Sequence, residues 1–482
     1  MADKNEKQYA SSFKIIQLSL YKIGEEHLNP YINLKQGNIG MATSLQYHED
    51  IFWPCFGATL ILTDNAENLI ADMPIQGFEK VVLEVEDVLE ERYSYEFRVW
   101  TVSNRLVQDR KQQYTLGLIS TEGLVNEGTH INTKVKGNTS TVVEEILKSY
   151  LKVPVELIDT EPSATSVQYI PTKESPFSLI RKLCAKTISQ KTTKAMQKKI
   201  SSDIGAEPAL SNSDVDPKAA EKATGTAGYL FFQTRKGFTF KSIDKIISSG
   251  GDFEGDEPIG DKFVYQLAKI GEPSLYKIQE IVYGQEINMI KQLREGAFNS
   301  LVCFFNINTG EYDERVYKLA DMWGDMAHMG SQDILGEGQE KLSDHPTRTM
   351  STIVNHENWF MDSKVASNES KHGGSGENQF PDWQKNFLQQ GISRASTLFR
   401  QQLTVSLTGH LELCAGDKID IRIPDQTQES QKEIAWDPEN SGTYLIKNLN
   451  HQFLMGPTPS VYTVLELIRD SAGIKDQESK VK

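Results

Sequence analysis

The fold is decided by the C-terminal stretch from Gln402 to Asp470, which opens with Leu403-Thr-Val-Ser-Leu-Thr408. Apolar and polar residues alternate there, and the alternation returns at residues 418–423, 444–446 and 461–468, with turn residues between the runs. A period of two residues bounded by turns is typical of half-buried antiparallel strands. Four such runs close together predict a small barrel or sandwich. Because the stretch contains no cluster of nucleophiles, bases or metal ligands, we expect a structural module.

The composition indicates an acidic protein of several domains. At 482 residues the chain is long enough for roughly three or four domains. It carries 66 acidic and 51 basic residues, a formal charge of −15, which argues against a protein that grips nucleic-acid phosphates. The N-terminus lacks the apolar core of a signal peptide. No run approaches the ~20 apolar residues of a membrane-spanning helix, so we expect no membrane span.

The cysteines favour a protein that matures in a reducing cytoplasm. They are far apart and form no Cys-x-x-Cys pair: Cys55, Cys184, Cys303 and Cys414. Each lies beside apolar residues, which is typical of buried, reduced thiols. We therefore expect no disulfide framework.

Strands dominate from Phe13 to about Val135, where residues 58–63, 93–100 and 114–119 alternate in polarity. The period then becomes helical. A capping box at Thr141–Glu144 predicts a helix, and Ser175 with Pro176 predicts the start of another. A short strand at 167–170 separates them, and residues 229–233 and 237–241 predict a hairpin.

Further strands are expected at 276–282, 300–306 and 313–319, with a short helix at 288–294 and a longer one after Asp382. Two polar segments, 189–228 and 325–380, contain few large apolar residues and are expected to be exposed insertions. Lysines within Lys191–Lys199 could form a polyanion-binding patch, but a solvated loop is the favoured interpretation.

No catalytic pattern is present: the chain has no G-x-S-x-G, H-E-x-x-H or phosphate-binding loop. Residues 252–256 resemble the start of a calcium loop, but Glu257 replaces its glycine and Phe263 its bidentate glutamate. His345 and His356 are interpreted as surface histidines. A run of carboxylates is interpreted as a solvated acidic edge rather than a metal site: Glu84, Glu86, Asp87, Glu90 and Glu91. We therefore predict no enzyme, no cofactor, and no catalytic, cofactor-binding or metal-binding residue.

Several segments together resemble the baseplate hub protein of contractile-tailed bacteriophages and the N-terminal part of type VI secretion spike proteins. They are Tyr169–Leu183, Gly228–Phe240, Gly271–Gln279, Gly409–Ile421 and Gly442–His451. The resemblance covers most of residues 13–470, as an order of elements more than as invariant residues. Segments 189–228 and 325–380 look like additions to the simplest hubs. No oligonucleotide-fold domain or β-helical repeat follows, so the spike is expected to be a separate polypeptide.

The resemblance implies an α+β, mainly β chain with two tail-tube-like antiparallel β-barrel domains and a mixed α/β hub domain. We place the first tube-like domain at residues 1–132 and the second at 261–320 with 395–470. The hub domain comprises 133–260 with 321–394, including flexible insertions 189–228 and 325–380. Residues 471–482 form a charged tail.

The resemblance also implies a function: a homotrimeric ring in the virion tail baseplate, assembled in the host cytoplasm. The ring would join the sixfold tail tube, or a tube-initiator protein, to the threefold central spike, and DNA would pass through its channel without specific binding. Tape-measure and baseplate wedge proteins are further implied partners. The alternatives are a tail-associated cell-wall hydrolase, which needs a carboxylate pair in a cleft, a carbohydrate-binding module, and the hub of a tailocin or type VI secretion device.

Overall fold

The structure, a computed structural model, describes most of the chain. The described residues are 11–24, 30, 32–34, 41–65, 75–108, 111–163, 165–189, 226–248, 264–267, 277–284, 288–305, 307, 310, 312–332, 334, 340–353, 360–362, 383–424, 436–456 and 458–473. The carboxylates at 252–256 and the lysines at 191–199 lie outside these residues, as does His356.

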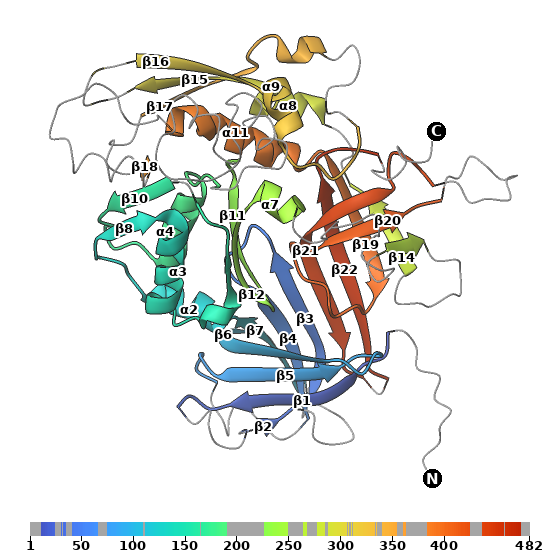
Figure 1. Ribbon diagram of the computed structural model, residues 1–482. Coiled ribbons are helices and arrows are strands. Elements are labelled where there is room, and N and C mark those ends of the chain that lie inside the picture. The colour runs from blue at the N-terminus through green and yellow to red at the C-terminus, as the bar shows by residue number, and fades with distance from the viewer. Residues whose placement is uncertain are drawn as a thin grey trace, which may run out of the picture.

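A 13-stranded sheet holds most of the strands (Figure 1). Its N-terminal members are β1 (Lys14–Tyr21), β2 (Ile32–Asn33), β3 (Ala42–Asp50), β4 (Gly57–Asn65), β5 (Lys80–Glu86), β6 (Arg92–Gln108) and β7 (Lys111–Ile119). Its C-terminal members are β13 (Val264–Leu267), β14 (Lys277–Tyr283), β19 (Gln401–Thr408), β20 (Lys418–Arg422), β21 (Gly442–Leu454) and β22 (Ser460–Arg469). The strand order is β2-β1-β5-β6-β7-β4-β3-β21-β20-β13-β14-β19-β22.

Alternating burial explains why these residues form strands. Val81, Leu83 and Val85 of β5 are buried while the residues between them are partly exposed. They lie directly opposite buried aromatic residues of β6, namely Phe97, Tyr95 and Tyr93. One apolar cluster runs from these strands to the inner faces of β19 to β22. The prediction of a mainly β chain with some helices is thus confirmed.

Two separate barrels are not observed, because β21 joins the two groups of strands into one continuous sheet. This strand is 13 residues long, much longer than the predicted 444–446. Its residues 442–445 pair with β20, and residues 448–454 on the same side pair with β3. Its other edge pairs with β22. The N-terminal and C-terminal strands therefore share one hydrogen-bonded framework.

A mixed α/β region packs beside the sheet (Figure 1). It contains α2 (Thr121–Gly128), α3 (Thr139–Tyr150), α4 (Pro176–Cys184), α7 (Ile243–Ser248), the 3₁₀ turn η1 (Val155–Leu157), β8 (Val135–Asn138), β9 (Ile158–Thr160), β10 (Thr165–Tyr169), β11 (Tyr229–Thr234) and β12 (Gly237–Ser242). Together with β18 (Phe360–Asp362), these strands form the three-stranded sheets β18-β10-β8 and β11-β12-β9. The predicted hairpin and the Ser175-Pro176 helix start are confirmed. The capping box is wrong: α3 has its N-cap at Asn138, and Glu144 accepts a hydrogen bond from the hydroxyl of Thr160 at 2.6 Å.

A third group of elements lies at the top of Figure 1. It comprises α8 (Met289–Glu295), β15 (Asn299–Phe305), β16 (Tyr312–Lys318), α9 (Leu319–Met322), η3 (Trp323–Asp325), η4 (Glu340–Ser343), β17 (Arg348–Ile353) and α11 (Trp383–Thr397). Strand β15 pairs with β16 on one side and with β17 on the other, in a sheet of their own. They do not pair with the C-terminal strands, with which 261–320 was grouped.

The segment 325–380, predicted as an exposed insertion, is partly built into this group. Met326, Met329 and Ile334 are buried, and β17 adds a parallel strand to β15. Sequence polarity is misleading here because a few large apolar side chains, supported by backbone pairing, are enough to fix a short segment. Residues 354–359 and 363–380 lie outside the described residues.

Candidate interaction site

The run of carboxylates between β5 and β6 stabilises its own turn. Asp87 Oδ1 accepts hydrogen bonds from the backbone N–H groups of Leu89, at 2.8 Å, and Glu91, at 3.0 Å. Glu86 pairs with Arg92 at 3.1 Å, and this hydrogen bond is the main reason that the pKa of Glu86 is lowered. These contacts agree with a solvated acidic edge. Glu84 and Glu90, which are also part of the run, lie on β5 and in the turn.

The described residues contain no group of three or more His, Cys, Asp or Glu side chains able to hold a metal ion. The four cysteines are free. Burial raises the pKa of the Cys55 thiol to about 11 and that of Cys184 to about 12, which disfavours the nucleophilic thiolate. Among the described helices, none is long and apolar enough to cross a membrane.

A buried carboxylate, Glu49, joins three parts of the molecule. It is 1% exposed and lies near the end of β3. One carboxylate oxygen accepts hydrogen bonds from the hydroxyl of Tyr47 at 2.5 Å and from the backbone N–H of Arg235 at 2.6 Å. The other accepts from the backbone N–H of Ala415 at 2.7 Å. Arg235 is in the β11–β12 turn and Ala415 precedes β20, so Glu49 docks the α/β hairpin onto both halves of the sheet.

Charged neighbours surround this junction. The guanidinium of Arg235 lies over the ring of Tyr93, 4.9 Å from its centroid. Lys236 pairs with Asp417 at 3.0 Å, and that carboxylate also accepts from the backbone N–H of Cys414. Burial raises the pKa of Glu49 to about 7, against the opposing effect of its hydrogen bonds. A carboxyl that changes charge near neutral pH therefore sits where the parts of the chain meet.

Sequence reasoning missed Glu49, although β3 contained the signal. Leu45, Tyr47 and Glu49 are all on the buried phase of the strand. An acidic residue on the apolar phase needs buried hydrogen-bond donors. Those donors come from residues far away in sequence, so a single sequence does not reveal them.

A second buried cluster fixes α11 to the rest of the chain. Arg394 is completely buried and bonds to Asp244 of α7 at 2.9 Å and to Asp470 at 2.8 Å. Asp470 also accepts from the backbone N–H of Met329 at 3.0 Å and contacts Nδ1 of His328 at 3.0 Å. Burial alone would raise the pKa of Asp470, but Arg394 and His328 hold it below its usual value. The cluster is structural, since it is enclosed by the protein.

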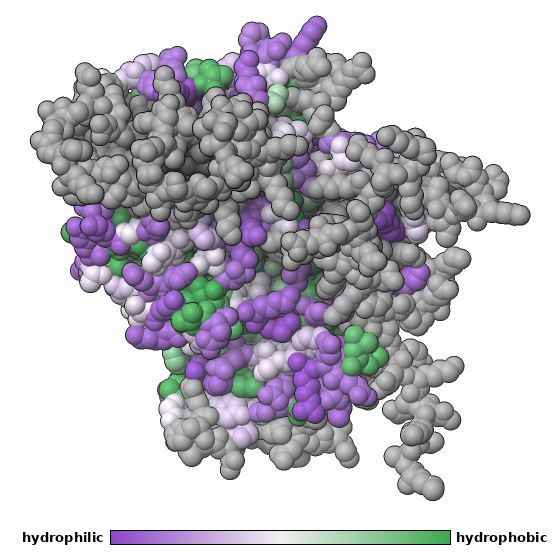
Figure 2. Space-filling view, viewed as in Figure 1, coloured by the Kyte–Doolittle hydropathy of each residue, from purple (hydrophilic) through white to green (hydrophobic). Residues whose placement is uncertain are grey.

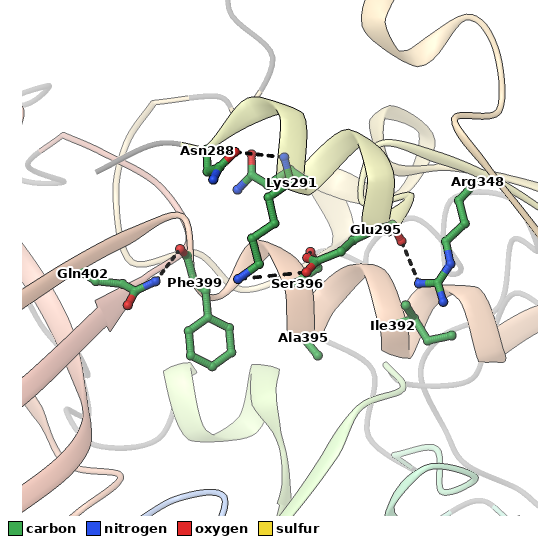
Figure 3. A pocket seen from close by; sticks show the side chains of 10 residues that line it. Asn288, Lys291, Glu295, Arg348, Ile392, Ala395, Ser396, Phe399 and Gln402 are labelled. Atoms are coloured by element: carbon green, nitrogen blue, oxygen red, sulfur yellow. Dashed lines mark hydrogen bonds and ion pairs between the residues drawn. The ribbon is translucent and has the colours of Figure 1, made fainter. Parts of the chain in front are cut away.

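The pocket between α8 and α11 has a volume of about 340 Å³ (Figure 3). Its polar groups mostly bond to one another: Glu295 accepts from the hydroxyl of Ser396 at 2.5 Å and lies 4.0 Å from Lys291. Arg348 donates to the backbone carbonyl of Glu295 at 3.1 Å. One carboxylate beside a lysine offers neither the two carboxyls of a glycosidase nor a nucleophile with its base.

The coloured part of the face in Figure 2 is mostly hydrophilic, with separate apolar patches between polar residues. Some exposed apolar side chains follow single elements. Trp100, Val102, Leu106 and Val107 lie on β6, and Phe305, Tyr312, Val316 and Ile353 lie on the β16-β15-β17 sheet. Exposed apolar groups gathered in this way mark contact surfaces more often than scattered ones do.

Solved structures of phage tail proteins are similar to this one in fold. A tail protein from Neisseria meningitidis MC58 matches with 9% identity and a TM-score of 0.48, covering 95% of this chain and 97% of its own. The 43 kDa tail protein of prophage MuSo2 from Shewanella oneidensis matches with 9% identity and a TM-score of 0.48, covering 94% and 98%. A component of the E. coli type VI secretion system, described as similar to T4 phage tail proteins, matches with 9% identity and a TM-score of 0.37, covering 89% and 74%.

No protein-family model matches the sequence, and no curated protein does. The resemblance predicted from the sequence is confirmed in that the chain is similar in fold to phage tail proteins and to a type VI secretion component.

Proposed function

We propose that the chain is a structural, non-enzymatic hub subunit in the baseplate of a phage tail or of a related contractile injection device. Three copies form a ring that joins the sixfold tail tube to the threefold central spike. The observation that carries the proposal is the pair of strand groups, 14–119 and 264–469, held edge to edge in one sheet by the β3–β21 ladder.

Two strand modules in one chain would allow a threefold ring to match a sixfold tube. A chain with two similar strand modules offers six modules when three copies assemble around a closed axis. In the C-terminal module the pairings lead from β21 through β20, β13, β14, β19 and β22 and back to β21, which suits a tube-like unit. We propose the domain limits given above on this basis, with β15 and β16 assigned to the hub domain beside α11.

The hub domain connects the modules rigidly in this proposal. Its β11–β12 hairpin contacts Glu49 and Asp417, which belong to different modules. The modules therefore keep a fixed relation, as a symmetry adaptor needs. The buried Glu49 and Arg394 clusters serve this purpose and are not open to a substrate.

The ring would pass DNA without holding it. Each copy carries −15, so three copies carry three times −15, or −45. A duplex threaded through a basic bore gains free energy by counterion release at each contact, whereas an acidic or neutral bore lets it slide. The spike and tube or tube-initiator proteins are the proposed partners, with tape-measure and wedge proteins next to them, in the baseplate of the virion.

Native mass measurement of the chain co-expressed with the neighbouring spike protein tests the proposal. We expect three copies of each chain, and electron microscopy of the complex should show a threefold ring. A stable 2:1 or 6:6 complex would contradict it. Sustained hydrolysis of peptidoglycan by the rigorously purified protein would contradict the non-enzymatic role.

A further inference from the structure

Among the strands that the structure describes, the outer part of β6 has a neighbour on one edge only. Strand β5 pairs with β6 only from Arg92 to Arg98, and the backbone of Val99 bonds to residues 78 and 79. From Trp100 to Gln108, β6 pairs with β7 alone among the described strands. Open edges are usually protected in soluble monomers, because they present unpaired N–H and C=O groups to other chains.

This edge is also apolar. Trp100 is 58% exposed, Leu106 60% and Val107 59%, and all three are within the same nine residues. Two β-bulges, at Trp100 and at residues 104–105, bend the strand. Bulges prevent a long uninterrupted ladder, so a partner would pair over a short stretch.

In the other module, β14 likewise has a short edge without a neighbour among the described strands. This strand pairs with β19 from Ile278 to Tyr283, but with β13 only at Lys277 and Ile278. Residues 279–282 have no described strand on that side, and Val282 is 53% exposed. The two open edges therefore belong to different modules of one chain.

The charges of the two edges are complementary. Arg105 is the single charged residue between 100 and 108, and Glu280 is the single charged residue between 279 and 282. Both side chains are exposed, and neither forms an ion pair within the described part of the chain. Arg105 only donates a hydrogen bond to Gln112, at 2.8 Å.

We propose that the β6 edge of one copy contacts the β14 edge of the next copy, with Arg105 of the first facing Glu280 of the second. The contact buries Trp100, Leu106 and Val107 against Val282 and adds a short intermolecular ladder. Because the two patches differ, the contact is heterologous. It closes into a ring when the rotation that relates neighbouring copies equals a full turn divided by the number of copies. This inference rests on the ring of the proposed function and names the surfaces that form it.

Charge reversal in the full-length chain tests the inference. Arg105→Glu and Glu280→Arg place like charges in the contact, and each should raise the dissociation constant of the oligomer roughly tenfold or more. The double variant, R105E/E280R, restores an opposite pair and should recover most of the affinity. Lys134→Glu makes the same charge change at an exposed position before β8 and should have no effect.

The oligomer is measured by analytical ultracentrifugation over a concentration series, with thermal unfolding to verify that each variant folds. A trimer that neither single reversal weakens would overturn the inference and leave the proposed ring standing. Weakening by both singles without recovery in the double variant would also overturn the pairing of these two residues. A wild-type chain that stays monomeric at every concentration overturns it too, while the spike complex tests the proposed function separately.

Discussion

Replacement of Glu49 by glutamine should remove a pH dependence from the stability of the whole chain. In the folded protein burial raises the pKa of Glu49 from 4.5 to about 7. The folded state therefore binds the Glu49 proton more tightly than the unfolded state does. The resulting stability is fully present below pH 4.5 and is lost as the pH rises through 7.

The size of the effect follows from the shift. A rise in pKa from 4.5 to about 7 corresponds in full to between about 3 and 4 kcal/mol, at about 1.4 kcal/mol for each pH unit. Wild-type protein should thus lose about 3 kcal/mol from this group between pH 4.5 and pH 8. Glu49→Gln stays neutral throughout, and its carbonyl oxygen can still accept from Tyr47 or the backbone of Arg235, so its own profile should lack this component.

The assay is urea unfolding at several values between pH 4.5 and 8, followed by tryptophan fluorescence. The quantity compared is the difference in free energy of unfolding between wild type and Glu49→Gln at each pH. In this difference the contributions of the other titrating groups cancel, including that of His451, whose pKa burial lowers to about 3. Glu145→Gln, on the exposed face of α3, is the matched control and should leave the wild-type profile unchanged. A pH profile of Glu49→Gln that parallels the wild-type profile would refute the reasoning.

Three further predictions concern stability and DNA. Arg394→Met should lower the free energy of unfolding by about 3–5 kcal/mol, because it leaves Asp470 buried without its cation. The control, Arg92→Met at the exposed start of β6, should lower it little, and equal losses in the two variants would contradict this prediction. Gly237→Ala should destabilise the chain by about 2 kcal/mol or more, since Gly237 has φ +130° and the added methyl group would clash with the backbone of Leu157. In the control, Gly128→Ala, the added methyl group has no atom within 4 Å, and unfolding curves of the two variants that coincide would disprove the prediction. Gel shift at low salt should detect no tight duplex binding by the assembled ring, and binding that weakens steeply with added salt would oppose the conduit proposal.

Local patterns predicted much of the secondary structure. The hairpin around Arg235 and Lys236, the helix start at Ser175 and the C-terminal strands appear where alternation, N-cap and proline signals placed them. These features depend on neighbours within a few residues, which the sequence displays directly.

Long-range pairing was much less visible. The extension of β21 to Leu454 and its pairing with β3 involve residues about four hundred positions apart, and residues 446–454 mix polar and apolar side chains. The grouping of β15 with β17 depends in the same way on a distant segment. Glu49 and Arg394 are ordinary charged residues in sequence, and they acquire their roles only from donors and acceptors that the fold brings to them.

The continuous ladder between β3 and β21 also gives the molecule a mechanical property. Seven residue pairs, from Asn448–Asp50 to Leu454–Ser44, cross between the two strand groups. A force directed along these strands loads the hydrogen bonds together in shear, whereas a force at right angles opens them one after another. The junction between the two strand groups should therefore resist a load along the strands and yield first to a load at right angles to them.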